Sequence, residues 1–162
     1  MEIAARRRAD VMQPALELVF QLDGVLAPAL SVGATPQGAR RVVPITGGRF
    51  TGPQLRGEIV PGGADWQFDR ADGVTQVEAL YLLRTEDGVH IQVHNRGLRH
   101  GPPAVMARLA AGESVAPEEY YFRAAPEFSA PAGPYEWLNR SLFVCSGERR
   151  AGAIRLWVFR VT

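Results

Sequence analysis

The sequence predicts an all-β fold, a single antiparallel β-barrel of about lipocalin size that carries one short α-helix. Apolar and polar residues alternate in several short segments separated by turn residues, which is typical of half-buried strands. A glycine-rich block from Pro44 to Trp66 supplies the bulges and corners that a strongly curved sheet needs. Because about eight to ten such strands would otherwise leave exposed edges, closure into a barrel is the expected architecture.

The length of the chain fits one domain. It has 162 residues, of which 46% are hydrophobic and 22% are charged, the usual balance of a folded protein. The alternating pattern starts at Leu16. Residues 1–14 are therefore expected to form a mobile tail, and residues 15–162 the barrel domain.

The expected strands follow one another along the chain. Leu16–Leu22 opens the sheet, and residues 33–38 are expected to form a loop before the glycine-rich block. A strand at residues 63–69 then returns through a turn at 70–73. Two hairpins are expected, one of Val74–Arg84 with Val89–Arg96 and one of Leu142–Ser146 with Ile154–Val161, and a further extended segment begins at Tyr120.

One helix is expected between these strands. Residues 102–112 begin with proline in the first turn and end at a glycine, the usual signals for helix ends. Val105, Met106 and Leu109 fall on one face of this helix. We interpret that apolar stripe as a packing face.

The composition excludes several kinds of chemistry. All 18 basic residues are arginine, so the chain lacks the lysine that a Schiff base, pyridoxal phosphate or a Walker-type loop requires. A formal net charge of +1 argues against nucleic-acid binding. His90, His94 and His100 are poorly grouped, and no dinucleotide-binding glycine motif follows a strand, so we expect no metal and no cofactor.

Cysteine content and hydropathy indicate the compartment. Cys145 is the single cysteine, which precludes an intrachain disulfide, and it lies in an apolar run where a buried thiol is expected. No signal peptide and no apolar run of membrane-spanning length occur, so we expect a cytoplasmic protein outside the membrane. The last strand is apolar on both faces, so we expect another element or a second subunit to cover it, most simply in a homodimer.

Several sequence blocks together resemble a known family. They are Gly47–Pro53, Pro61–Gln67, Arg84–Gly88, Asn95–Gly97, Glu119–Arg123 and Trp137–Arg140. In this order and spacing, over residues 16–161, the sequence resembles domain-of-unknown-function family DUF3237, also called UPF0311. The resemblance implies a compact β-barrel and self-association, and fungal relatives found with polyketide pathways imply ring-forming or isomerising work on small molecules. Leu80 and Leu82 depart from the more polar residues expected there, which implies a more apolar pocket or interface.

Register arithmetic selects the first catalytic candidates. A three-residue turn at 86–88 places Tyr81 opposite Val93 and Glu78 opposite Arg96, whereas a two-residue turn would set Arg84 against Ile91. The three-residue turn gives cleaner faces and pairs an acid with a base. The return through residues 70–73 brings Asp65 level with Val77 or Glu78.

Asp65, Glu78 and Arg96 would then lie at one height in the barrel mouth. Neighbouring carboxylates raise the pKa of one of them, as general acid or base catalysis near neutral pH requires, while Arg96 would hold an anionic oxygen. A purely structural interpretation stays open: Asp65 caps the turn after Gly63, and Glu78 with Arg96 is a plain cross-strand pair.

Further candidates complete the predicted site. Tyr81 is the third catalytic candidate, as a hydrogen-bond donor, and the predicted substrate-binding residues are Arg49, Trp66, His94, Arg96 and Tyr121. The alternative for Arg49 is a surface or interface position. The alternative for the aromatic residues, Trp137 included, is the core.

These observations predict a barrel that binds a small organic molecule bearing a carbonyl, enol or carboxylate group. The leading hypothesis is a cofactor-free isomerase, hydratase or cyclase, and the alternatives are a non-catalytic carrier barrel and a purely structural oligomer partner. An acid that faces into a closed apolar cavity favours catalysis. A pocket without an inward titratable group favours simple binding.

Overall fold

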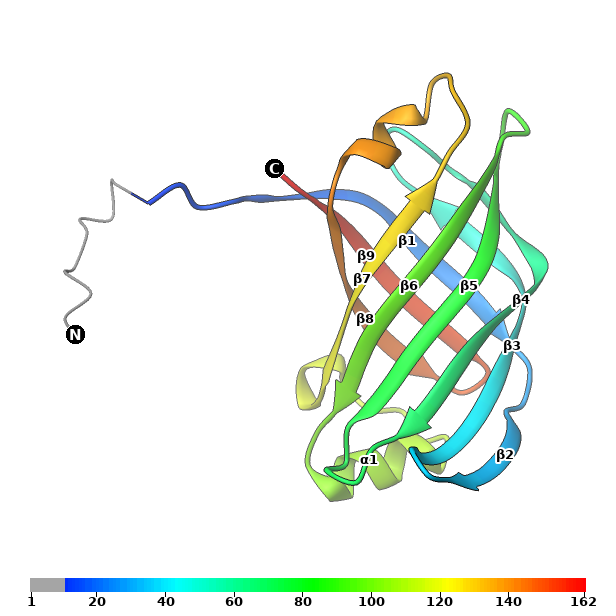
Figure 1. Cartoon of the computed structure of the whole chain (residues 1–162), viewed down its shortest axis with the longest axis vertical. Helices are drawn as coiled ribbons and strands as arrows, with labels where there is room; N and C mark the ends of the chain where they lie inside the picture. Colours follow the sequence, from blue (N-terminus) through cyan, green and yellow to red (C-terminus); the bar gives the residue numbers. More distant parts are fainter. Residues whose placement is uncertain (1–10) are drawn as a thin grey trace.

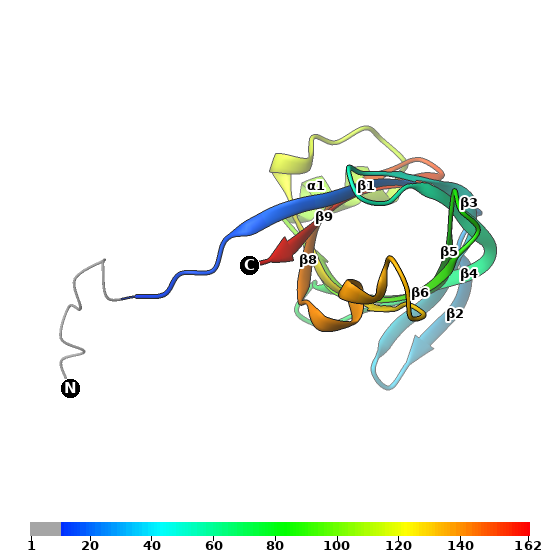
Figure 2. The same ribbon diagram turned by 90° about the horizontal axis from the view of Figure 1, so that it is seen from above.

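The computed structural model describes residues 11–162, in which nine strands form one antiparallel sheet that closes on itself (Figure 1). The strands are β1 (Leu16–Leu26), β2 (Leu30–Thr35), β3 (Gly38–Thr51), β4 (Gly57–Asp69), β5 (Thr75–Thr85), β6 (His90–His100), β7 (Tyr121–Ser129), β8 (Phe143–Arg150) and β9 (Ala153–Val161). Pairing of β1 with β3 and β9 closes the ring, and β2 pairs only with β3 and projects outside it (Figure 2). The predicted closed barrel with one short helix is confirmed.

The glycine-rich block forms the bulged parts of β3 and β4. Register shifts occur between Ile45 and Arg49 in the β3–β4 pair and between Val60 and Ala64 in the β4–β5 pair. Gly48 has a φ of +133°, and a Cβ there would lie 2.2 Å from the carbonyl oxygen of Asp23. Only glycine therefore allows β3 to approach β1 where the barrel closes.

The hairpin of β5 and β6 has the predicted register. Leu83 pairs with Ile91, Tyr81 with Val93 and Glu78 with Arg96. The Thr85 N–H donates to the Val89 carbonyl at 2.9 Å, and Gly88 takes a φ of +86°, as the three-residue turn requires. The alternating faces of these two strands are therefore those that the sequence predicts.

Two predicted segments differ from the structure. The expected loop at residues 33–38 is largely strand, because β2 and β3 form a hairpin that turns at residues 36–37. The helix α1 covers Pro103–Ala110 and is shorter than the expected 102–112. Of the tail expected over residues 1–14, residues 1–10 lie outside the described residues.

Apolar residues are buried near both ends of the barrel. Leu138, on the short 3-10 helix Glu136–Arg140, is buried at the upper end as part of the larger core cluster. At the lower end α1 buries Leu109 against Val115, Tyr120 and Phe122, with Val105 and Met106 packed beside them (Figure 1). Among residues 11–162, no helix is long and apolar enough to cross a membrane.

Candidate functional site

A small cavity of about 40 Å³ lies inside the barrel and is lined by members of both apolar clusters. By volume it has room for roughly three water molecules. Its apolar lining includes Leu22, Ile45, Ile59, Val77, Phe122 and Leu156, and its polar lining consists of Asp65, Gln67, Tyr81, Asn95, Arg99 and Arg149. An apolar chamber with a few convergent polar groups is the usual form of a small-molecule site.

A row of paired residues places Asp65 and Asn95 on the inner face of the barrel. Asp65 on β4 pairs with Ala79 on β5, and Ala79 pairs in turn with Asn95 on β6. Paired residues of an antiparallel sheet share one face, and all three line the cavity. Ala79, between Asp65 and Asn95, contributes only a methyl group to this part of the lining.

Asp65 is a buried carboxylate held by two donors. Its side chain accepts a hydrogen bond from Gln67 Nε2 at 2.5 Å and another from the backbone N–H of Glu78 at 3.0 Å. Burial raises the pKa of Asp65 above its usual value, although these donors and the charges of Arg99 and Arg149 act in the opposite direction. The carboxyl therefore holds its proton more tightly than a surface aspartate does.

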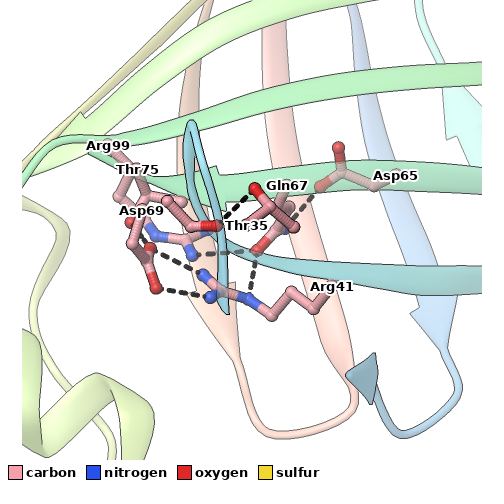
Figure 3. A network of polar contacts seen from close by, with 8 residues as sticks. Thr35, Arg41, Asp65, Gln67, Asp69, Thr75 and Arg99 are labelled. Atoms are coloured by element: carbon pink, nitrogen blue, oxygen red, sulfur yellow. Dashed lines mark hydrogen bonds and ion pairs between the residues drawn. The ribbon is translucent and has the colours of Figure 1, made fainter. Parts of the chain in front are cut away.

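A chain of hydrogen bonds orients Asp65 (Figure 3). Gln67 donates to Asp65 and accepts from Arg41 Nε at 2.9 Å, and Arg41 in turn forms an ion pair with Asp69 at 2.7 Å. Hydrogen bonds from Arg41 lower the pKa of Asp69, so this second acid is ionised. Thr75 also donates to Asp69 at 2.7 Å. The chain fixes Gln67, and through it the carboxyl of Asp65.

Two arginines bring positive charge into the cavity. Arg99 on β6 is 4% exposed, and its Cζ lies 5.4 Å from the centroid of the Phe122 ring. Over the part of the chain that the structure describes, neither Arg99 nor Arg149 has a carboxylate oxygen within 4.0 Å. Burial lowers the pKa of Arg99 to about 10, so the group remains a cation at neutral pH.

Few protein groups compensate the charge of Arg99. Its Nη2 lies 3.4 Å from Gln67 Oε1, which is a long hydrogen bond to a neutral acceptor. Gln67 Oε1 also accepts from Arg41 Nε at the shorter distance of 2.9 Å, so the two arginines share this oxygen. The positive charge of Arg99 is therefore available to a ligand in the cavity.

Two buried polar atoms beside the cavity have no hydrogen-bond partner among the described residues. They are Arg99 Nε, a donor, and Asn95 Oδ1, an acceptor. The amide nitrogen of Asn95 contacts Cys145 Sγ at 3.7 Å, a weak interaction. Because buried polar groups are almost always paired in folded proteins, two unpaired atoms on one cavity require an explanation.

The structure separates the predicted catalytic residues. Tyr81 is buried and lines the cavity with Asp65, and burial raises its pKa, so the hydroxyl stays protonated. Glu78 lies on the outer face and contacts His94 Nε2 at 2.8 Å. The predicted alignment of Asp65 with Val77 or Glu78 is wrong, because Asp65 pairs with Ala79 and so points to the opposite face from Glu78.

The predicted substrate-binding residues all lie away from the cavity. Arg96 is exposed, 3.8 Å from Glu127, and Arg49 is exposed on β3. Trp66 is 52% exposed, and Tyr121 stacks on His100 at the surface, so neither ring lines the cavity. His94 lies outside the barrel, where it contacts Glu78.

The sequence patterns did not single out Gln67, Asn95, Arg99 or Arg149. The sequence does contain a signal for two of them. Every second residue of β6, counted from Ile91, faces the inside of the barrel, and Asn95 and Arg99 are at such positions. A polar residue at an inward position of a barrel strand marks a candidate site. Within residues 11–162, no group of three or more His, Cys, Asp or Glu side chains is placed to hold a metal ion.

Similar proteins support the fold over nearly the whole chain. A UPF0311 protein of Rhodopseudomonas palustris strain TIE-1 is 36% identical over 152 residues, which cover 93% of this chain and 99% of that protein. The crystal structure of RPA1785, a conserved protein of unknown function from the same species, has a TM-score of 0.91 at 34% identity and covers 94% of this chain and 100% of that one. The crystal structure of a β-barrel-like protein from Acinetobacter baumannii AYE has a TM-score of 0.82 at 34% identity, and it covers 96% of this chain and 100% of that one.

One more distant relative is named for a reaction. The hydroalkoxylation enzyme phnH of Penicillium herquei is 31% identical over 80 residues, which cover 49% of this chain and 53% of that enzyme. A crystal structure of an enzyme from Penicillium herquei has a TM-score of 0.70 at 21% identity and covers 99% of this chain and 100% of that one, a likeness of fold alone. The model of the family described as "protein of unknown function (DUF3237)" matches residues 14–161, so the chain belongs to that family.

Proposed function

We propose that this protein is a cofactor-free acid–base enzyme that acts on a small organic molecule bound inside the barrel, with Asp65 as the proton-transferring group. The observation that carries this proposal is a buried carboxyl with a raised pKa on the wall of a largely apolar cavity that Tyr81 and Arg99 also line. A general acid or base works best when its pKa lies near the operating pH, and burial moves Asp65 in that direction.

The cavity offers further groups for such a reaction. Tyr81 supplies a protonated hydroxyl, and Arg99 supplies a fixed positive charge that would stabilise an enolate or carboxylate oxygen. In an isomerisation, Asp65 takes a proton from one carbon and returns it to another. In an addition of O–H across C=C, a C–O and a C–H bond form while the O–H bond and the π bond of C=C break, and one carboxyl can relay the proton from oxygen to carbon.

The fungal relative named as a hydroalkoxylation enzyme supports the same class of chemistry. Hydroalkoxylation is a proton-transfer reaction that requires no redox change. The shared segment is about half of each chain. The relative therefore supports the class of reaction and does not identify the substrate of this protein.

Deuterium exchange tests the proposal before the substrate is identified. A panel of small ketones, enols and hydroxyalkenes is incubated with the protein in deuterated buffer, and incorporation at carbon is followed by NMR. Wild-type protein should accelerate exchange for at least one member, and Asp65→Asn should reduce that rate by about 10² to 10⁴. Glu58→Gln removes an acid on the outer surface, paired with Arg84, and should leave the rate unchanged.

A carrier barrel is the second candidate, and one observation favours it. Both oxygens of Asp65 already accept hydrogen bonds from the protein, an arrangement that also ties β4 to β5. Ligand binding without exchange for any panel member would support this candidate. Full exchange activity in a folded Asp65→Asn protein would refute the role of Asp65.

A further inference from the structure

Two residues that line the cavity, Arg99 and Asn95, each carry a buried polar atom without a partner among the described residues, and this narrows the class of ligand. We propose that the site selects a small organic anion that also carries a hydroxyl group, with Arg99 binding the anionic oxygen and Asn95 binding the hydroxyl. This inference rests on the small-molecule site proposed above. It adds the substrate class and names two specificity-determining residues.

The charges around the cavity favour an anion. Arg99 and Arg149 both line it, whereas Asp65 is the one acid among the described residues of its lining. Arg41 does not add to this imbalance, because Asp69 neutralises it at 2.7 Å. A bound anion would compensate the second cation, and a charge-assisted hydrogen bond to Arg99 Nε would pair an atom that the described residues leave unpaired.

The contacts of Arg99 leave its Nε without an acceptor among the described residues. The Cζ atom rests over the Phe122 ring at 5.4 Å, and Nη2 lies 3.4 Å from Gln67 Oε1. These contacts hold the group in place without satisfying Nε. A buried arginine held in this way is preorganised for a carboxylate.

A hydroxyl group suits Asn95. The amide of Asn95 contacts Cys145 on one side and has one unpaired polar atom on the other. A hydroxyl both donates and accepts, so it pairs with that atom whichever way the amide is oriented.

The spacing of the two residues limits the ligand. The Arg99 guanidinium contacts the side chain of Gln67, whose backbone position is two residues, or about 7 Å, along the strand from the row of Asp65 and Asn95. Three water molecules take up about 90 Å³ in the liquid, which is about the volume of six non-hydrogen atoms of an organic molecule. A short hydroxy acid such as 3-hydroxypropanoate meets both conditions.

NMR titration of the intact protein with three matched probes tests the inference. We expect 3-hydroxypropanoate to bind about fivefold or more tightly than propanoate, which lacks the hydroxyl, and about tenfold or more tightly than 3-hydroxypropanamide, which lacks the charge. Arg99→Met should weaken 3-hydroxypropanoate about tenfold or more. The Asn95→Leu protein should bind 3-hydroxypropanoate only as tightly as the wild-type protein binds propanoate. The control Arg56→Met, at an exposed arginine, should bind like wild type.

A stability measurement separates a binding role from a structural one. Each substitution removes an unpaired buried atom, and Gln67 Oε1 still accepts from Arg41 when Arg99 is replaced, so Arg99→Met and Asn95→Leu should keep about the wild-type Tm while they lose affinity. A lower Tm with unchanged affinity would overturn the inference, as would equal affinity of the wild-type protein for all three probes or binding to none.

The two proposals fail in different ways. Exchange of neutral ketones without binding of any anion overturns the ligand class and leaves Asp65 as the proton-transferring group. Binding of the hydroxy acid through Arg99 and Asn95 without exchange of any panel member supports the ligand class and overturns the proposed catalysis.

Discussion

The hydroxyl of Tyr120 stabilises the part of the barrel that carries Arg149, and we predict that Tyr120→Phe lowers the free energy of unfolding by about 1 to 3 kcal/mol. The hydroxyl of this buried residue accepts a hydrogen bond from the backbone N–H of Arg149 at 2.8 Å. Strands β7 and β8 pair only at Arg123 with Ser146 and at Ala124 with Cys145. Arg149 lies beyond these two pairs, and the Tyr120 hydroxyl accepts the hydrogen bond of its backbone N–H.

The magnitude follows from what the substitution leaves behind. Phenylalanine keeps the ring that packs with Leu109 and Phe122, so the loss is confined to the hydrogen bond. A buried N–H without an acceptor costs about 1 to 3 kcal/mol. At about 2 to 4 °C per kcal/mol for a protein of this size, the Tm should fall by about 2 to 12 °C.

Urea denaturation followed by fluorescence measures this change. Tyr135→Phe is the matched control, because its hydroxyl donates to Asp87 at 2.7 Å in an exposed position where water can replace it. That control should change stability by less than about 0.5 kcal/mol. Equal effects of the two substitutions would refute the reasoning, because they would show that loss of the Tyr120 acceptor costs no more than loss of an exposed hydrogen bond.

Three other measurements probe Asp65, Cys145 and the assembly. Because burial raises the folded-state pKa of Asp65, the folded protein binds this proton more tightly than the unfolded chain does. The free energy of unfolding should therefore fall as pH rises above about 4. Measured by urea denaturation at increasing pH, the stability of Asp65→Asn relative to wild type should rise. Burial raises the pKa of Cys145 to about 11, so the thiol should react with a disulfide reagent only after unfolding, and rapid labelling of the native protein would contradict its burial. Light scattering at micromolar concentration should give the mass of a dimer, and a monomeric mass would remove that expectation.

The β5–β6 hairpin could be predicted because its sequence determines both its faces and its turn. Each strand alternates over 11 residues, and Gly88 supplies the left-handed position of a three-residue turn. Counting outward from the turn along both strands then gives each cross-strand pair. Closure of the barrel was predictable from strand number and glycine content, although the apolar pattern of β2 is too short to indicate a strand.

The position of Asp65 could not be obtained in the same way. The connection between β4 and β5 holds five residues, 70–74, because Asp69 pairs with Thr75, whereas the expected turn held only residues 70–73. One extra residue moves Asp65 from the level of Glu78 to that of Ala79 and so turns it to the other face. Arg70 and Asp72 form an ion pair within this turn, a feature that the pattern of apolar residues does not reveal.

The interior arginines depend on contacts between distant parts of the chain. Arg149 reaches the cavity from the β8–β9 hairpin, and Arg99 from the end of β6, so their proximity arises only when the barrel closes. Arginine is rarely fully buried without a partner, so a sequence pattern assigns it to the surface by default. The unpaired Nε of Arg99 is visible only in the folded structure.

The two cations also determine how Asp65 responds to a ligand. In the free protein, Arg99 and Arg149 hold the pKa of Asp65 down against the effect of burial. An anion bound to Arg99 would screen that charge and add its own repulsion, so the pKa of Asp65 would rise further. Ligand binding would therefore make the carboxylate of Asp65 a stronger base, which suits the removal of a proton from carbon in the proposed isomerisation. The same residues that select an anion thus prepare Asp65 to act on it.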